Sequence, residues 1–131
     1  MSLAFVLLWM FFFHIVDDFY LQGLLISLKQ KSWWEENAPS KMYEKDYYVA
    51  LIMHGFSWAF MTMLPAAFYL HFNIDWGFVF ILAFHALLHT TIDNEKANEK
   101  SINLIIDQVS HLFQILTMWL YLLVEAGVFL Q

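Results

Sequence analysis

Four long apolar stretches limit what this chain can fold into more than any other feature. They cover about residues 3–28, 47–70, 76–97 and 101–130. About 20 predominantly apolar residues are enough to cross the hydrocarbon core of a bilayer as a helix. Hydrophobic residues make up 61% of the 131-residue chain, more than a soluble domain of this length could bury. We therefore predict a single all-α membrane domain over residues 1–131, an antiparallel bundle of four transmembrane helices.

The lysines predict how this bundle is oriented. Four of the six lie in the polar connection 29–46, and the other two lie in the connection 94–101. Because lysine and arginine are enriched in cytoplasmic segments, we predict that both connections are cytoplasmic and that both termini are non-cytoplasmic. The N-terminus lacks the basic segment and cleavage pattern of a signal peptide, so we expect the first helix to be retained.

Net charge and cysteine content exclude two classes of site. The formal net charge is −6, and the chain has no arginine. Without a basic stripe to follow a phosphate backbone, a nucleic-acid partner is not expected. The chain also has no cysteine, which excludes disulfides and thiolate metal sites.

Ionisable side chains inside the apolar stretches are the unusual feature of this sequence. A charged side chain at the centre of a membrane helix costs about 2.5–3.5 kcal/mol, so each needs a partner or a water-filled cavity. Residues four apart share one face of a helix. Three histidine–aspartate pairs have this spacing, one on each of three predicted helices: His14 with Asp18, His89 with Asp93, and Asp107 with His111.

The depth of these residues predicts a common site. At about 1.5 Å of rise per residue, the three pairs and His54 all fall about 6–21 Å from the cytoplasmic boundary. In helix bundles, metal sites are formed by side chains that project inward from facing helices at the same depth. A mixed imidazole and carboxylate set suits Zn, Fe or Mn, and seven residues exceed the four ligands of one tetrahedral zinc. The sequence leaves open whether one or two ions bind. The predicted ligands are His14, Asp18, His54, His89, Asp93, Asp107 and His111.

Four motifs at these positions resemble those of a known family. HxxxDFxLQ begins at His14, HxxxDxxK at His89 and DQxxH at Asp107, with the single histidine His54 between the first two. Over nearly the whole chain, this order resembles the family called domain of unknown function 3307, small multi-helix membrane proteins of bacteria and phages. The resemblance implies a multi-pass protein of a bacterial inner membrane. The pattern is similar in style to membrane-bound metal-dependent hydrolases, whose activity is itself mostly inferred, and the resemblance implies no established reaction.

Three further residues are predicted to support the ligands by hydrogen bonding: Gln22, His85 and Gln108. Such partners hold imidazoles and carboxylates in the orientation that a metal requires. Asp17 stands one residue away from the spaced pairs, and we place it outside the site. The alternative for the whole set is a polar core in which hydrogen bonds alone join the helices.

Three functions fit this pattern. The first is a metal-dependent hydrolase, in which an ion activates water and Asp18 is the candidate general base. The second is a transporter or channel for metal ions or protons. The third is a non-catalytic membrane module whose metal is structural and which binds a protein partner or another copy of itself.

Overall fold

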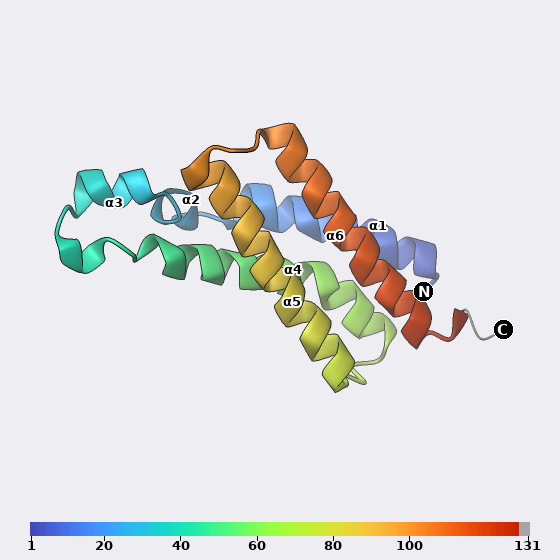
Figure 1. Cartoon of the computed structure of the whole chain (residues 1–131). Helices are drawn as coiled ribbons and strands as arrows, with labels where there is room; N and C mark the ends of the chain where they lie inside the picture. The colour runs from blue at the N-terminus through green and yellow to red at the C-terminus, as the bar shows by residue number, and fades with distance from the viewer. Residues whose placement is uncertain (129–131) are drawn as a thin grey trace.

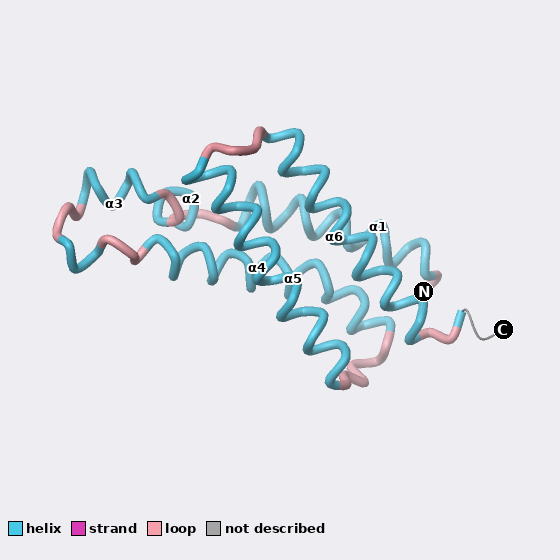
Figure 2. Tube along the Cα trace, viewed as in Figure 1, coloured by secondary structure: helices cyan, strands magenta, loops and turns pink. Residues whose placement is uncertain are grey.

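The chain is helical throughout the part that its computed structural model describes, residues 1–128, with no strand there. Four long helical segments run side by side, each antiparallel to the next, and the N-terminus lies at the same end of the bundle as the end of α6 (Figure 1). Loops and turns connect these segments, and most of them are short (Figure 2). The four segments are α1 (Leu3–Ile15) with its extension η1 (Val16–Leu21), α4 (Tyr47–Tyr69), α5 (Trp76–Asn94) with its extension η3 (Glu95–Glu99), and α6 (Leu104–Glu125). Residues 129 and 130 of the fourth predicted helix lie outside the described part.

The first predicted helix, residues 3–28, is divided in the structure. After η1 the chain turns at Gly23, whose φ of +49° is a conformation that glycine adopts at little cost. The short helix α2 (Leu25–Leu28) follows. The connection 29–46, predicted as a loop, contains the helix α3 (Lys31–Asn37) and one 3₁₀ turn (Lys41–Tyr43).

Three segments of the described chain are long and apolar enough to cross a membrane: Leu3–Leu21, Lys41–Tyr69 and Trp76–Glu99. The helix α6 has 22 residues and would be long enough. Its first half carries Asp107, His111 and Gln114, and these polar residues lower its hydropathy. The structure therefore supports three of the four predicted spans by composition.

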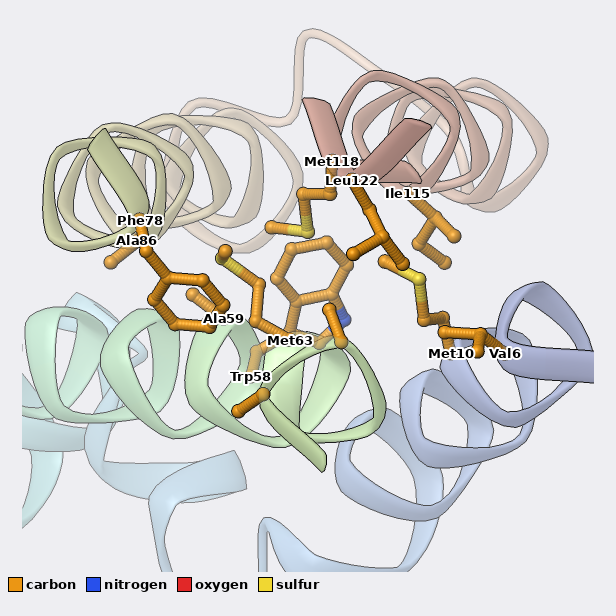
Figure 3. Close-up of a cluster of buried hydrophobic side chains, with 12 residues drawn as sticks. Val6, Met10, Trp58, Ala59, Met63, Phe78, Ala86, Ile115, Met118 and Leu122 are labelled. Carbon is orange, nitrogen blue, oxygen red and sulfur yellow. The ribbon is translucent and has the colours of Figure 1, made fainter. Parts of the chain in front are cut away.

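An apolar core fills the half of the bundle nearer the N-terminus and the end of α6. Its side chains come from α1, α4, α5 and α6 and point toward one another (Figure 3). Trp58, Met10 and Leu122 are completely buried in it, and Met118 is 1% exposed. This core fixes how the four segments pack, and the polar residues of the apolar stretches gather in the other half.

The helices α4 and α5 approach closely at Gly55. A Cβ atom on this residue would lie 2.6 Å from the carbonyl oxygen of Ala86 and would clash with the hydroxyl of Thr90. Gly55 and the fully buried Ala59 are four residues apart, the small-xxx-small spacing that lets membrane helices pack closely. This contact places His54 on α4 next to His89 on α5.

Candidate metal centre

Two groups of side chains in the described structure could hold a metal ion. The first contains Asp18, His54, His89 and Asp93, and the second contains Asp18, Asp107 and His111. Within each group, one ligand atom from every residue lies within 4.8 Å of the others. All six side chains are buried, five of them to 1% exposure or less and Asp18 to 6%. The structure thus brings together six of the seven predicted ligands, from four helical segments that are distant in sequence.

The backbone of η1 helps to direct two adjacent carboxylates inward. Asp17 and Asp18 both lie in this π-helical segment, and both are buried. A π-helical turn has an extra residue compared with an α-helical turn, and such turns are frequent at functional sites. The wider turn explains how two neighbours in sequence can both face the interior.

In the first group, ligand atoms surround the Nε2 atom of His54. This nitrogen lies 3.2 Å from Nε2 of His89, 3.3 Å from Oδ2 of Asp93 and 3.5 Å from Oδ1 of Asp18. Two ligands bound at about 2.1 Å to a tetrahedral zinc lie roughly 3.4 Å apart. The spacing of these four atoms therefore fits a shared ion.

Where the two groups meet, three buried atoms of His111, Asp107 and Asp93 lie close together without a hydrogen bond to any described residue. Nε2 of His111 lies 3.3 Å from Oδ1 of Asp107 and 3.6 Å from Oδ1 of Asp93, and none of the three has a hydrogen-bond partner. A buried polar atom left unsatisfied costs about 1–3 kcal/mol. A divalent cation among the three would satisfy all of them. Asp93 thus directs Oδ2 to the first group and Oδ1 to the second, and it could bridge two ions.

Two lysines bind oxygens of the aspartates, and in Asp93 the bound oxygen is the one that also faces the first group. Nζ of Lys29 lies 2.5 Å from Oδ2 of Asp93, and Nζ of Lys96 lies 2.6 Å from Oδ2 of Asp107. Sequence reasoning gave neither lysine a place in the site: it put Lys29, which is 5% exposed, in the connection 29–46 and Lys96 in the connection 94–101. The only sequence signal was that Lys96 follows Asp93 by three residues, on the same helix face.

The charges of the buried side chains in and around the metal centre are consistent with a bound cation. Two ammonium groups balance two of its buried carboxylates, and two negative charges remain when the histidines are neutral. One divalent cation would neutralise that remainder, and such compensation is what a buried charge requires. The four carboxylates belong to Asp17, Asp18, Asp93 and Asp107.

Gln108 supports both groups at once, as predicted from its position. Its amide nitrogen donates to Oδ2 of Asp18 at 2.9 Å and to Oδ2 of Asp107 at 3.0 Å. Its oxygen lies 3.2 Å from Nε2 of His14, and Nδ1 of His14 accepts from the Trp58 indole at 2.8 Å. Both nitrogens of His14 are therefore engaged, and this residue, predicted as a ligand, belongs to neither group. In the structure it orients Gln108 instead.

Two more side chains orient the first group. Gln22 donates to Oδ1 of Asp18 at 3.0 Å, which is the supporting role predicted for it. Asp17, predicted to lie outside the site, accepts from the Ser57 hydroxyl at 2.6 Å, and its other oxygen lies 3.7 Å from Nδ1 of His54. A carboxylate on this side of a histidine favours the ring orientation in which the other nitrogen can bind metal, although at 3.7 Å Asp17 makes no hydrogen bond to the ring.

His85 is linked to the second group through Gln114. The Gln114 amide lies 3.4 Å from Nδ1 of His85 and 3.3 Å from Nδ1 of His111, and Nε2 of His85 lies 3.2 Å from the Thr117 hydroxyl. With the amide oxygen toward His111, Gln114 would accept the Nδ1 proton and leave Nε2 free to bind metal. His85 therefore has the supporting position predicted for it.

No protein-family model, curated protein or solved structure matches this chain. Membership of the family that the sequence motifs resemble stays a prediction. Function is therefore inferred from the geometry of the metal centre and from the helices that surround it.

Proposed function

We propose that this protein is an integral membrane metal protein whose His/Asp centre hydrolyses a substrate that reaches it from the cytoplasmic side. The observation that carries this proposal is the set of three buried atoms on His111, Asp93 and Asp107 that lie close together but make no hydrogen bond with any described residue. In a core joined by hydrogen bonds alone, these atoms would be paired with one another. Their mutual distances of 3.3 and 3.6 Å instead suit ligands of a common ion.

The surface of α6 supports its assignment as a fourth membrane span. Its buried polar residues Asp107, His111 and Gln114 all point into the bundle. At about 1.5 Å per residue, the helix is long enough to cross the hydrocarbon core. Apart from Thr117 and Glu125, the last residue of the helix, its exposed side chains are apolar: Leu104, Ile105, Ile106, Val109, Leu112, Phe113, Leu116, Leu120 and Val124.

The orientation predicted from lysine gives a labelling experiment. Ser40 and Asn73 are both exposed, and they lie in connections at opposite ends of the bundle. With both termini non-cytoplasmic, a cysteine at Asn73 will react in intact cells with a thiol reagent that cannot cross the membrane, and a cysteine at Ser40 will react only after lysis. The chain's lack of native cysteine removes background labelling. Labelling of the Ser40 variant in intact cells, with the Asn73 variant protected, would invert the topology.

The arrangement of residues suits hydrolysis. A bound divalent ion makes its water acidic enough to ionise near neutral pH and polarises a carbonyl or phosphoryl oxygen. Among the described residues, Asp18 belongs to both groups, which makes it the best-placed carboxylate to accept a proton from a water held between them. Gln22 and Gln108 keep its oxygens in position.

The apolar core argues against transport. A path for ions needs polar groups or water along its length, whereas Met10, Trp58 and Leu122 are completely buried beyond the metal centre (Figure 3). The near-complete burial of all six ligands favours a different alternative, a structural metal site in a non-catalytic module. Hydrolysis by the metal-loaded protein, lost on chelation, separates the two.

Metal content tests the centre directly. Protein purified in mild detergent without chelator will carry at least one equivalent of Zn, Fe or Mn per chain by elemental analysis. Because a bound ion stabilises the native state, chelation will lower its unfolding temperature. The variant Asp107→Asn will lose most of the metal, whereas His85→Gln, which touches no ligand atom directly, will keep it. Metal-free protein that unfolds at the same temperature with and without added ions would leave only the hydrogen-bonded core.

A further inference from the structure

A groove of about 480 Å³ lies between α5 and α6. Its walls are apolar and include Phe84, Leu88, Val109 and Phe113. Phe84 is 50% exposed, and Phe113 is 67% exposed. Because α5 belongs to a candidate membrane span, this groove opens toward the hydrocarbon of the bilayer.

The groove runs along the helices and ends beside the metal centre. On α5 it extends from Ile81 to Ile92, about 16 Å at 1.5 Å of rise per residue. Ile92 directly precedes Asp93, and Val109 on α6 is two residues from Asp107. A molecule lying in the groove would therefore have its cytoplasmic end at the level of the metal ligands.

The floor of the groove contains polar residues that are already paired. His85 and Gln114 are 3.4 Å apart, and the Thr117 hydroxyl donates to the Gln114 carbonyl at 2.8 Å. Their hydrogen-bonding groups are used within the bundle, so the groove offers an apolar surface along most of its length. A hydrocarbon chain is the kind of molecule that such a surface binds.

Lys96 does not line the groove but lies about one helical turn beyond its cytoplasmic end. Leu88, Ile92 and Lys96 are spaced four residues apart, so they follow one face of α5 and its extension. The Lys96 side chain is 27% exposed, and it also contacts Asp107. A positive charge at the end of an apolar groove complements a molecule with a hydrocarbon tail and an anionic head.

We propose that the α5/α6 groove binds a membrane lipid with an anionic phosphate head group, and that this lipid is the substrate of the metal centre. Its acyl chain lies between Phe84 and Phe113, and its phosphate lies against Lys96. The proposal depends on the proposed function, since it names the substrate class of the same site. The lipid reaches the centre laterally from the bilayer, which explains how a site so deeply buried obtains its substrate.

Photo-crosslinking in vesicles tests this proposal. The full chain is reconstituted in phosphatidylcholine vesicles with either a phosphatidic acid or a phosphatidylcholine probe, each with the same photoreactive acyl chain. The phosphatidic acid probe will label the chain about tenfold more strongly, as expected for lysine near an anionic head group. The labelled positions will fall within residues 81–92 or 109–117. Equal labelling by both probes would overturn the proposal.

Matched variants separate the tail from the head group. Ser110→Trp fills the groove, which Ser110 lines, and will reduce labelling by the phosphatidic acid probe to that of the phosphatidylcholine probe. Thr91→Trp, at an exposed position of α5 outside the groove, will leave labelling unchanged. Lys96→Gln will remove the preference between probes, and Lys96→Arg will keep it. Equal loss in the Thr91 and Ser110 variants, or no loss in either, would contradict the groove as the site.

Two further outcomes identify other occupants. If excess inorganic phosphate reduced labelling by the phosphatidic acid probe and Ser110→Trp did not, Lys96 would bind a free anion. That result would overturn the proposal of a lipid in the groove. Crosslinks between two chains through residues 81–92 would assign the groove to a second copy and overturn it as well. Metal content is measured on each sample. If the protein carries metal but shows no preference between the probes, the lipid proposal alone is wrong. If the protein carries no metal, the proposed metal centre is wrong whatever the labelling shows.

Discussion

The substitution Asp93→Asn will empty the metal centre and lower the free energy of unfolding by about 3–5 kcal/mol, the usual cost of removing one partner from a buried ion pair. Asp93 is completely buried. Its oxygens lie 2.5 Å from Lys29, 3.3 Å from His54 and 3.6 Å from His111. An amide has nearly the same shape but no negative charge, so it neither attracts a cation nor balances the Lys29 ammonium.

A double variant separates these two effects. Asp93→Asn combined with Lys29→Met removes both buried charges of the pair, and replacing such a pair by apolar groups is often close to neutral for stability. The double variant will therefore regain most of the lost stability and remain without metal. Asp46→Asn, a half-buried carboxylate that makes no capping hydrogen bond to α4, is the control. Elemental analysis and unfolding by detergent titration give both readouts, and a full metal content in Asp93→Asn would contradict the assignment.

Spacing and depth predicted much of this site because helix geometry is regular. Once a segment is helical, residues four apart share a face, and the rise per residue fixes their depth. These two rules led to the six residues that the structure brings together. His14 satisfies both rules as well, and only the tertiary contacts that engage its two nitrogens with Trp58 and Gln108 separate it from them.

Other features needed the folded chain. The turn at Gly23 and the helix α2 bring Lys29 back into the bundle, and nothing in the local sequence indicates its pairing with a residue 64 positions away. The inward direction of Asp17 depends on the π-helical turn of η1. In α6, polar residues lower the mean hydropathy although they face inward, so composition alone understates how apolar its outer surface is.

The close contact between α4 and α5 gives the second large effect, from the substitution Gly55→Ala. In an ordinary helix interior this change would stabilise by about 1 kcal/mol, because alanine is the better helix former. Here the new methyl group would lie 2.6 Å from the carbonyl oxygen of Ala86, a backbone atom that cannot rotate away, and would clash with the Thr90 hydroxyl. Overpacking of this kind costs about 1–3 kcal/mol, so we expect a net loss of stability.

The same substitution will weaken metal binding, although Gly55 touches no ligand atom. His54 is next to Gly55 in sequence, and His89 is next to Thr90. The helix contact holds the Nε2 atoms of these two histidines 3.2 Å apart, so moving the helices apart separates them. Loss of such positioning typically costs 10- to 100-fold in metal affinity, roughly the range seen for supporting residues. Gly77→Ala is the matched control, because the nearest atoms to its Cβ are side-chain atoms of Asp75 and Tyr121 at 3.3–3.4 Å, which can yield. Competitive metal titration and unfolding of both variants check the prediction, and a Gly55→Ala protein as stable and as tightly metal-bound as Gly77→Ala would show that α4 and α5 do not meet at Gly55.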